Sequence, residues 1–315
     1  MSKPLTSNKL IASVKRRAQI PTNQNTFSNQ DFLELANEEM AIGLVPSILE
    51  LHEDYFLWEQ DIDLVPGQSN YRIPYRAAGN KLKDVYYLDT NNNLYELTRI
   101  GNDELAEYNG PFTQGYVRAF RIQNNEVVIE PSINGYVGGK LRFLYFIRPN
   151  DLVIDEEGAV ITGINTTTGS ITLASLPKAY SVSQKYDFIQ STSPHVHLEI
   201  DISAVAINSS QKTLTFNPTD LPSELEVGDY LCLAQESIVP QVPTDLHVVL
   251  AHRTAARCLE ALGDTQGLQN ANIKLQEMEV KLGNIIDNRV EGAPFKVKNR
   301  HGLLKSGSLA NRRRR

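Results

Sequence analysis

The sequence predicts an α+β protein in which a helical bundle, made of N-terminal helices and a C-terminal helix pair, carries an antiparallel β meander and an inserted small β-barrel or sandwich. Apolar residues recur at helical spacing over residues 28–58 and again over 243–285. Residues 61–148 instead alternate between apolar and polar side chains, which is typical of strands. Residues 151–236 are dominated by Thr, Ser, Val and Ile and have almost no helical period.

The composition is that of a folded, non-membrane protein. The chain has 315 residues, of which 41% are hydrophobic and 22% charged, so it can form a large core and more than one domain. Its two cysteines, Cys232 and Cys258, provide neither a disulfide framework nor a zinc set, which suits a reducing cytoplasm. No apolar run reaches the roughly 20 residues of a membrane span, and no signal-peptide core follows the first charges. We expect synthesis in the cytosol and no membrane partner.

The N-terminal region divides into an arm and two helical segments. Residues 1–26 are polar and basic, and we expect a flexible arm there. Ser28 and Asp31 form a capping-box pattern that starts a helix. Its buried face is predicted at steps of four, and Pro46 begins a second helical segment that runs to about residue 58. The predicted buried residues of the two segments are Phe32, Ala36, Met40, Leu44, Ile48, Leu51, Tyr55 and Phe56.

The predicted meander is marked by its turns. Asparagines at 91–93 separate two strand-like runs, 84–89 and 94–99, and predict a hairpin. Asn124 and Asn125 predict a second hairpin in the same way. Residues 27–150 and 237–288 together form the predicted core domain.

Residues 151–236 form a predicted inserted β domain with a weak internal repeat. Residues 163–173 and 206–216 share an Ile-Asn strand end, a polar turn and a second strand, and each is followed by Leu-Pro. We therefore expect two related hairpins inside a small barrel or sandwich.

The C-terminal region has two predicted helices and a tail. Residues 243–262 form the first helix, with Gly263 as its C-cap, and Asp264 caps the second. The second helix has a seam at coiled-coil spacing that must pack within the bundle or on another subunit. The seam includes Leu268, Ala271, Leu275, Met278, Leu282 and Ile285. Beyond it, residues 289–315 lose the period and form a predicted extended tail.

Charge is sorted by position along the chain. Residues 1–20 carry five Lys or Arg and no acid, and residues 289–315 carry nine against one acid. Since the whole chain carries −6, the 268 residues between hold a net −19. An acidic body with basic ends favours an assembly component over an enzyme, because the body repels acidic surfaces that the ends attract.

The chain lacks the sequence signatures of common enzymes and cofactor sites. It contains no GxGxxG, Walker, HExxH, GxSxG or CxxC motif, so we predict no catalytic residues and no cofactor. For His195 and His197 we expect exposed loop imidazoles rather than metal ligands, and for His247 and His252 solvated or capping groups. Asp151, Asp155, Glu156 and Glu157 are interpreted as solvated acids at a domain boundary.

Two features of the tail point to binding. The four terminal arginines, residues 312–315, could bind phosphates or could simply keep the chain end soluble. The sequence favours neither interpretation over the other. The preceding stretch mixes cations with apolar residues, which favours docking on a protein because charge alone contributes little affinity in salt. The candidate docking residues are Arg289, Phe295, Lys296, Val297, Lys298, Arg300, Leu303 and Leu304.

Four stretches resemble the head-to-tail connector (adaptor) proteins of tailed bacteriophages. These stretches are DFLELANEE at 31–39, YRIPYRAAGNKL at 71–82, the predicted helix at 243–262 and the tail at 289–304. The resemblance covers about two-thirds of the chain, and the β insert is additional to the smallest members. It implies a virion protein at the head–tail interface that forms a ring, typically of twelve copies, beneath the portal.

The resemblance also implies partners. These are the portal protein, a downstream tail or nozzle protein, other copies of the chain, and genomic DNA that passes through an acidic lumen without sequence-specific binding. Residues 289–315 would then dock on the portal. Two alternatives stay open: another tail or baseplate subunit whose β insert binds a virion protein or glycan, and a DNA-binding protein that uses the basic ends.

Overall fold

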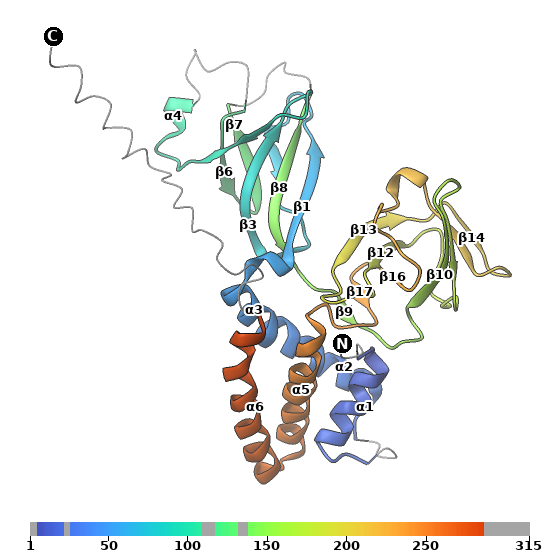
Figure 1. The fold of residues 1–315 in the computed structure, drawn as a ribbon. Helices are drawn as coiled ribbons and strands as arrows, with labels where there is room; N and C mark the ends of the chain where they lie inside the picture. Colours follow the sequence, from blue (N-terminus) through green and yellow to red (C-terminus); the bar gives the residue numbers. More distant parts are fainter. Residues whose placement is uncertain (1–4, 22–25, 109–116, 132–137, 287–315) are drawn as a thin grey trace.

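The computed structural model describes residues 5–21, 26–108, 117–131 and 138–286 of the chain. It has three parts: a group of helices, a pair of four-stranded sheets above them, and a seven-stranded sheet beside the pair (Figure 1). We call the second part the sandwich and the third the insert. Within the described residues, no helix has the length and apolar character that a membrane crossing requires.

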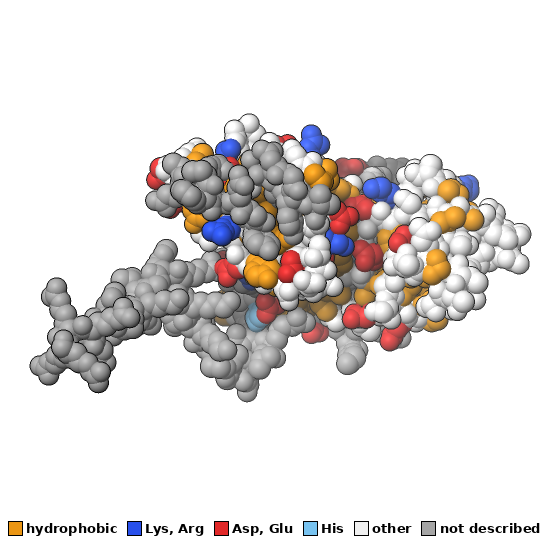
Figure 2. Space-filling model, turned by 90° about the horizontal axis from the view of Figure 1, so that it is seen from above, with side chains coloured by type: hydrophobic (Ala, Val, Ile, Leu, Met, Phe, Trp, Pro, Cys, Tyr) orange, Lys and Arg blue, Asp and Glu red, His pale blue; other side chains and the backbone are white. Residues whose placement is uncertain are grey.

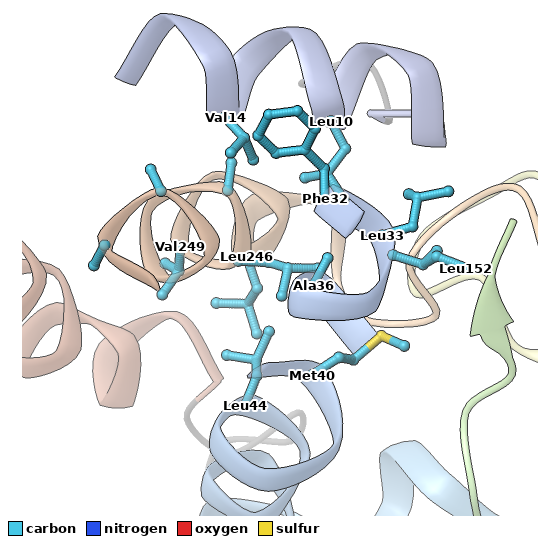
Figure 3. Close-up of a cluster of buried hydrophobic side chains, with 14 of the residues drawn as sticks. Leu10, Val14, Phe32, Leu33, Ala36, Met40, Leu44, Leu152, Leu246 and Val249 are labelled. Atoms are coloured by element: carbon cyan, nitrogen blue, oxygen red, sulfur yellow. The ribbon is translucent and has the colours of Figure 1, made fainter. Parts of the chain in front are cut away.

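The helical part is built from both ends of the sequence. Helices α1 (Ser7–Arg17), α2 (Asn29–Glu38), α3 (Val45–Leu51), α5 (His247–Leu262) and α6 (Thr265–Ile286) surround one apolar cluster. Phe32, Leu44 and Leu250 are among its buried side chains, and Figure 3 shows α1, α2 and α5 converging on it. The mixed class of helices and antiparallel sheets agrees with the sequence prediction.

The predicted flexible arm is wrong for residues 7–17, which form helix α1. Leu10, Ile11 and Val14 lie on one side of this helix and are buried against the helical cluster. Three consecutive cations, residues 15–17, end the helix, where its dipole favours positive charge. The cations made the segment look solvated, although its apolar residues have helical spacing.

The first predicted helix is confirmed, and its end differs from the prediction. Ser28 Oγ accepts from the Asp31 backbone N–H, and the Asp31 carboxylate accepts from the Ser28 N–H, which completes the capping box. A π-helical turn, η1 (Glu39–Leu44), joins α2 directly to α3. The second segment stops at Leu51, which is exposed, and a 3-10 turn η2 (Glu53–Phe56) leads to strand β1, which contains Trp58.

The sandwich consists of two four-stranded sheets rather than one meander. The first has the order β1 (Leu57–Asp63), β8 (Lys140–Ile147), β3 (Ala77–Leu88) and β4 (Leu94–Glu96). The second has the order β2 (Asn70–Arg72), β7 (Glu126–Glu130), β6 (Ala119–Gln123) and β5 (Thr98–Arg99), and a short helix α4 (Leu105–Tyr108) follows β5. Both predicted hairpins are confirmed, because β3 pairs with β4 and β6 pairs with β7 in antiparallel register.

The insert contains an open sheet with no closed barrel among its described strands. The order is β13 (His197–Ser203), β12 (Lys185–Ile189), β16 (Tyr230–Leu233), β10 (Ala159–Asn165), β11 (Ser170–Leu173), β15 (Thr213–Thr215) and β14 (Ala206–Asn208). A 3-10 turn η3 (Pro218–Asp220) precedes β16. Two short strands, β9 (Asp151–Leu152) and β17 (Glu236–Ser237), pair in parallel where the chain enters and leaves the insert. The predicted small barrel or sandwich is therefore not confirmed, and the described strands form one open sheet instead.

The internal repeat corresponds to two hairpins that pair with each other. Hairpin β10–β11 and hairpin β14–β15 meet along β11 and β15, where Ile171 faces Leu214. On either side of this pair, Ser170 faces Thr215 and Thr172 faces Thr213. Since residue numbers in the repeats differ by 43, these pairings are symmetric about Ile171 and Leu214. The two hairpins are related by a local pseudo-twofold axis.

In the C-terminal helix pair, the first helix ends and the second begins at the predicted residues. A 3-10 turn η4 (Thr244–Leu246) leads into α5, and Gly263 ends it with φ of 73°. The Asp264 carboxylate accepts from the Gly267 N–H at the start of α6. Ala271 is buried in the helical cluster, and Leu268, Leu275 and Met278 pack partly buried against it. The side chains of Leu282 and Ile285 lie outside the described residues.

Candidate functional site

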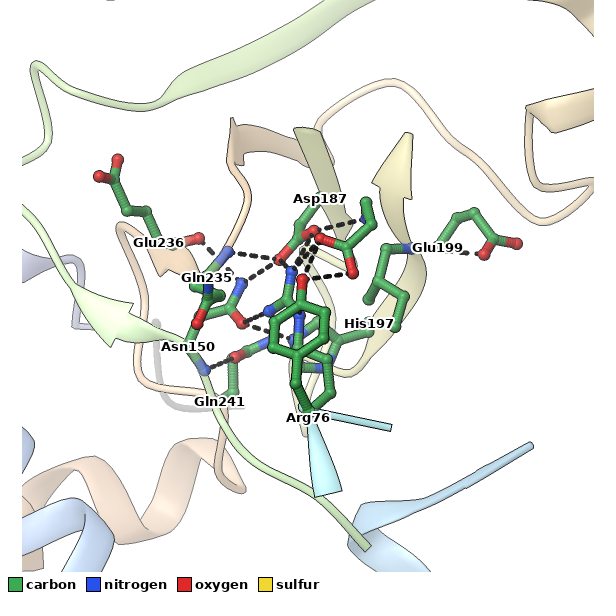
Figure 4. Close-up of polar contacts among 11 residues, drawn as sticks. Arg76, Asn150, Asp187, His197, Glu199, Gln235, Glu236 and Gln241 are labelled. Atoms are coloured by element: carbon green, nitrogen blue, oxygen red, sulfur yellow. Dashed lines mark hydrogen bonds and ion pairs between the residues drawn. The ribbon is translucent and has the colours of Figure 1, made fainter. Parts of the chain in front are cut away.

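The three parts of the molecule meet at a buried polar junction around Arg76. Arg76 immediately precedes β3 of the sandwich, Asp187 lies on β12 of the insert, and Asn150 lies in the connection from β8 to β9. These three side chains are at most 4% exposed. Figure 4 shows the side chains converging from these elements.

The Arg76 guanidinium donates hydrogen bonds to Tyr75, Asn150, Asp187 and Asp201. Nη2 donates to both carboxylate oxygens of Asp187 at 2.8 Å and to Asp201 Oδ1 at 3.0 Å, and Nη1 donates to Asn150 Oδ1 at 2.8 Å. Nε donates to the Tyr75 hydroxyl at 3.2 Å, which itself donates to Asp201 at 2.6 Å. Burial alone lowers the pKa of Arg76, but the hydrogen bond and charge of Asp201, with the charge of Asp187, raise it above the ordinary value.

Asp187 and Asn150 connect the junction to the backbone around it. The Asp187 carboxylate also accepts from the backbone N–H of Asp201 and of Gln235 and from Asn150 Nδ2. The Asn150 N–H donates to Gln241 Oε1 at 2.6 Å, just before the helix pair. A buried carboxylate with these donors is stable only while all of them stay in place. The junction therefore fixes the sandwich, the insert and the segment that leads into α5 relative to one another.

His197 is a neutral member of this junction. Its Nε2 lies 3.0 Å from Asn150 Oδ1, which can only accept, so the proton is on Nε2. Complete burial, together with the charge of Arg76, lowers the pKa of His197 to about 3. The His197 imidazole also packs edge to face against the indole ring of Trp58 on β1. Protonation of His197 would place a second cation beside Arg76 in a buried site.

A second junction holds the N-terminus of α1. The Asp155 carboxylate accepts from the Asn8 backbone N–H at 3.0 Å and from Thr6 Oγ1 at 2.7 Å, so a residue of the insert caps a helix 147 positions away. His247 Nδ1 accepts from the Leu5 N–H, and its Nε2 lies 3.1 Å from the Pro240 and Val242 carbonyls. Burial and the neighbouring His195 lower the pKa of His247 to about 4.

Several interpretations of polar residues need correction. His195, His197 and His247 are buried rather than exposed, and His252 is half-buried with Nε2 against the Ala271 carbonyl. Of the boundary acids, Asp151, Glu156 and Glu157 are exposed as expected, but Asp155 is a helix cap. Within the described part of the chain, no cluster of three metal-ligating side chains exists.

The arrangement at Arg76 suits positioning more than chemistry. Each charged group is already hydrogen bonded to another part of the protein, so no free nucleophile or base faces an open site there. Sequence reasoning missed Arg76, Asn150 and Asp187 because nothing local distinguishes them from surface polar residues.

The predicted docking residues lie outside the described residues. They are Arg289, Phe295, Lys296, Val297, Lys298, Arg300, Leu303 and Leu304, all within 287–315. Their assignment stays a prediction from the sequence.

Comparison with known proteins identifies a family. The family model described as SU10 adaptor protein matches residues 6–183, which include α1, both sheets of the sandwich and the first strands of the insert. No curated protein matches the chain. Because the model covers more than half of the sequence, including Arg76 and Asn150, the chain belongs to the SU10 adaptor protein family, a family of phage head–tail adaptors and virion structural proteins.

Proposed function

We propose that this protein forms a ring beneath the portal, joins the portal to the tail, and lets genomic DNA pass through its lumen. The family match supports this proposal most directly, since adaptors act between head and tail components. The buried junction at Arg76 adds support. A subunit that transmits load between two neighbours benefits from parts that are fixed to one another by desolvated charge contacts.

The charge distribution agrees with a DNA passage. On the face seen in Figure 2, Asp and Glu side chains gather where the sandwich meets the insert, whereas Lys and Arg lie singly. Like charge disfavours adsorption of DNA on a channel wall. We propose that acidic faces of the ring body line the lumen.

The portal contact is proposed for the tail, residues 289–315. Apolar anchors Phe295 and Val297 alternate with Lys296 and Lys298, a pattern that fits a groove with an acidic rim. Many copies of such a tail on one ring act together, so weak single contacts suffice.

The test is deletion of residues 289–315, followed by mixing with purified portal or portal-containing heads. The truncated chain should fold, with an unchanged unfolding midpoint, and should not bind the portal. A Phe295→Ser and Val297→Ser variant should lose most binding, while a variant with Arg312–315 replaced by Gln tests charge alone. Normal recruitment of the truncated chain would contradict the docking role, and end-on rings in micrographs would distinguish an adaptor from another tail subunit.

A further inference from the structure

Strand β1 forms an outer edge of the sandwich. It pairs with β8 along its whole length, from Leu57 opposite Phe146 to Asp63 opposite Lys140, and no described strand pairs with its other side. Alternate backbone N–H and C=O groups of an edge strand point away from the sheet and can bind an added strand. The β1 edge is seven residues long, whereas β4, at the opposite side of the same sheet, has three residues. This sheet therefore offers an added strand its longer edge at β1.

The side chains of β1 divide into an acidic face and an apolar face. Glu59, Asp61 and Asp63 lie on the outer face, and their side chains are 57%, 30% and 81% exposed. Trp58 and Ile62 lie on the inner face, where they pack against the sandwich core but are only half-buried. An added strand would cover this remaining apolar surface with one of its faces and would meet the three carboxylates with the other.

Strand β8 shows which side chains fit the acidic face. Lys140 lies opposite Asp63, with its Nζ 3.8 Å from the carboxylate. Arg142 lies opposite Asp61 and also forms an ion pair with Glu59. Two cations at a step of two residues thus serve the three acids from one side, and each carboxylate has lone pairs for further donors on the other side. Two β1 edges would repel each other, because like charges would then lie opposite. The free side of β1 therefore favours a strand that carries cations at steps of two.

The tail of the same chain carries the complementary pattern. Lys296, Lys298 and Arg300 are the only three cations in the sequence at successive steps of two, and the acids of β1 are the only three acids with that spacing. Phe295 and Val297 take the alternate positions, so in an extended strand they lie on the face opposite the cations. This segment therefore offers cations to the acidic face of β1 and apolar side chains to its half-buried inner face.

The tail starts close to the base of β1. Helix α6, whose last residue is Ile286, contacts α3, and α3 leads through η2 into β1. Figure 1 shows α6 ending below α3, with β1 rising from the helices. The eight residues between Ile286 and Phe295 span up to about 26 Å when extended, more than five times the roughly 4.8 Å between neighbouring strands. The linker is thus long enough to bring the segment onto β1 of its own chain, where both strands lead away from the helices.

We propose that residues 295–300 of the tail add to the free edge of β1 in the same chain as a further strand. Backbone hydrogen bonds along the edge and the two matched faces hold the segment there. This contact goes beyond the proposed function, because it gives the portal-docking segment a binding place on its own subunit. The β1 edge and the portal then compete for the same side chains. In the free subunit, the apolar anchors of the tail are covered until a portal offers a better site.

Trp58 is the only tryptophan in the sequence, and its fluorescence tests this contact directly. In the full chain the docked segment covers the edge beside the indole, so acrylamide should quench the emission less than in a chain that lacks residues 289–315. A synthetic peptide of residues 291–304, added to the truncated chain, should restore the protection. A peptide of the same composition in which cations and apolar residues do not alternate should not. Equal quenching of the full and truncated chains would overturn the proposal.

Charge reversal tests whether the acidic face of β1 meets the cations of the tail. Glu59→Lys with Asp63→Lys changes two exposed side chains and should raise the quenching of the full chain to that of the truncated chain. Lys296→Glu with Arg300→Glu should do the same. The four substitutions together should restore protection, because opposite charges face each other again. If the combined variant is quenched like the two reversed chains, the proposed pairing is wrong.

Dilution distinguishes the tail of the same chain from the tail of a second copy. Protection within one chain does not depend on protein concentration, so quenching of the full chain should stay constant on dilution. Protection that disappears on dilution would overturn the assignment and place the segment on a neighbouring copy. Leu303→Ser with Leu304→Ser, beyond the proposed strand, is the control and should leave quenching unchanged. Because no portal is present in these measurements, their failure is distinct from failure of the portal-binding test.

Discussion

Asp187 accepts two hydrogen bonds of 2.8 Å from Nη2 of Arg76, although 111 residues separate them in the chain. Both side chains are almost completely buried, and each comes from a different β part. A buried ion pair contributes little net stability compared with apolar residues, but it penalises every arrangement in which the partners separate. The pair therefore specifies how the insert sits on the sandwich more than how stable each part is.

Replacement of one member of this pair should be more harmful than replacement of both. Arg76→Met leaves the Asp187 carboxylate buried without its cation and should lower the free energy of unfolding by about 3–5 kcal/mol. Arg76→Met with Asp187→Asn should recover part of that loss, because the amide oxygen of Asn can still accept from the buried donors and carries no charge. Urea unfolding measures both. Arg142→Met, which breaks solvent-accessible ion pairs with Glu59 and Asp61, should cost about 1 kcal/mol or less and serves as the control. Equal losses in the single and double variants would refute the assigned role.

Acid should destabilise the fold through two buried histidines. The pKa of His197 is lowered to about 3 and that of His247 to about 4, against about 6.5 in an unfolded chain. The unfolded state therefore binds more protons, and stability falls as the pH drops from about 6.5 toward 4. We expect a loss of about 2–4 kcal/mol between pH 7 and pH 5, measured by urea unfolding at each pH.

The control for this pH dependence is His197→Gln, whose amide can donate to Asn150 Oδ1 without titrating. Its stability should fall less steeply over the same pH range. An identical slope in the variant and the wild type would show that His197 does not contribute.

Local sequence signals predicted the parts of the fold that depend on neighbouring residues. Ser28 with Asp31, Gly263, and Asn124 with Asn125 act through their own backbone geometry, and each produced the expected cap or turn. The junction at Arg76 was not predictable in this way, because its partners are brought together only by the pairing of distant strands. Likewise, the burial of His197 depends on Trp58 and Asn150, which a single sequence does not place beside it.

The error at α1 has a different origin. Leu10 and Val14 have the spacing of a buried helix face, but the surrounding cations and the absence of an acid suggested solvation. The missing cap signal also contributed, since Thr6 provides no side-chain cap and the capping carboxylate comes from Asp155 in the insert.

Asp155→Ala should loosen α1 without unfolding the molecule. Removal of a capping carboxylate costs about 1 kcal/mol and leaves the Asn8 N–H unsatisfied. Hydrogen exchange at the first turn of α1 should accelerate several-fold, while exchange in the sandwich stays unchanged. Glu157→Ala, two residues away and exposed, is the matched control. Unchanged protection of α1 in the Asp155 variant would mean that packing of Leu10 and Val14 alone holds the helix.

The duplicated hairpins offer a matched pair of turn positions at which substitution should have effects of different size. Gly169 and Lys212 occupy equivalent places in the repeats and both have positive φ, 69° and 52°. A Cβ at Gly169 would lie 2.0 Å from the Phe216 carbonyl oxygen, whose residue belongs to the other repeat. Gly169→Ala should therefore destabilise the insert by about 2 kcal/mol or more, since strain and a backbone clash act together. Lys212→Gly removes a left-handed side chain at a position that already tolerates one, so it should change stability by less than about 1 kcal/mol. Thermal unfolding of the two variants measures the difference, and similar losses would show that the two turns are related in sequence only.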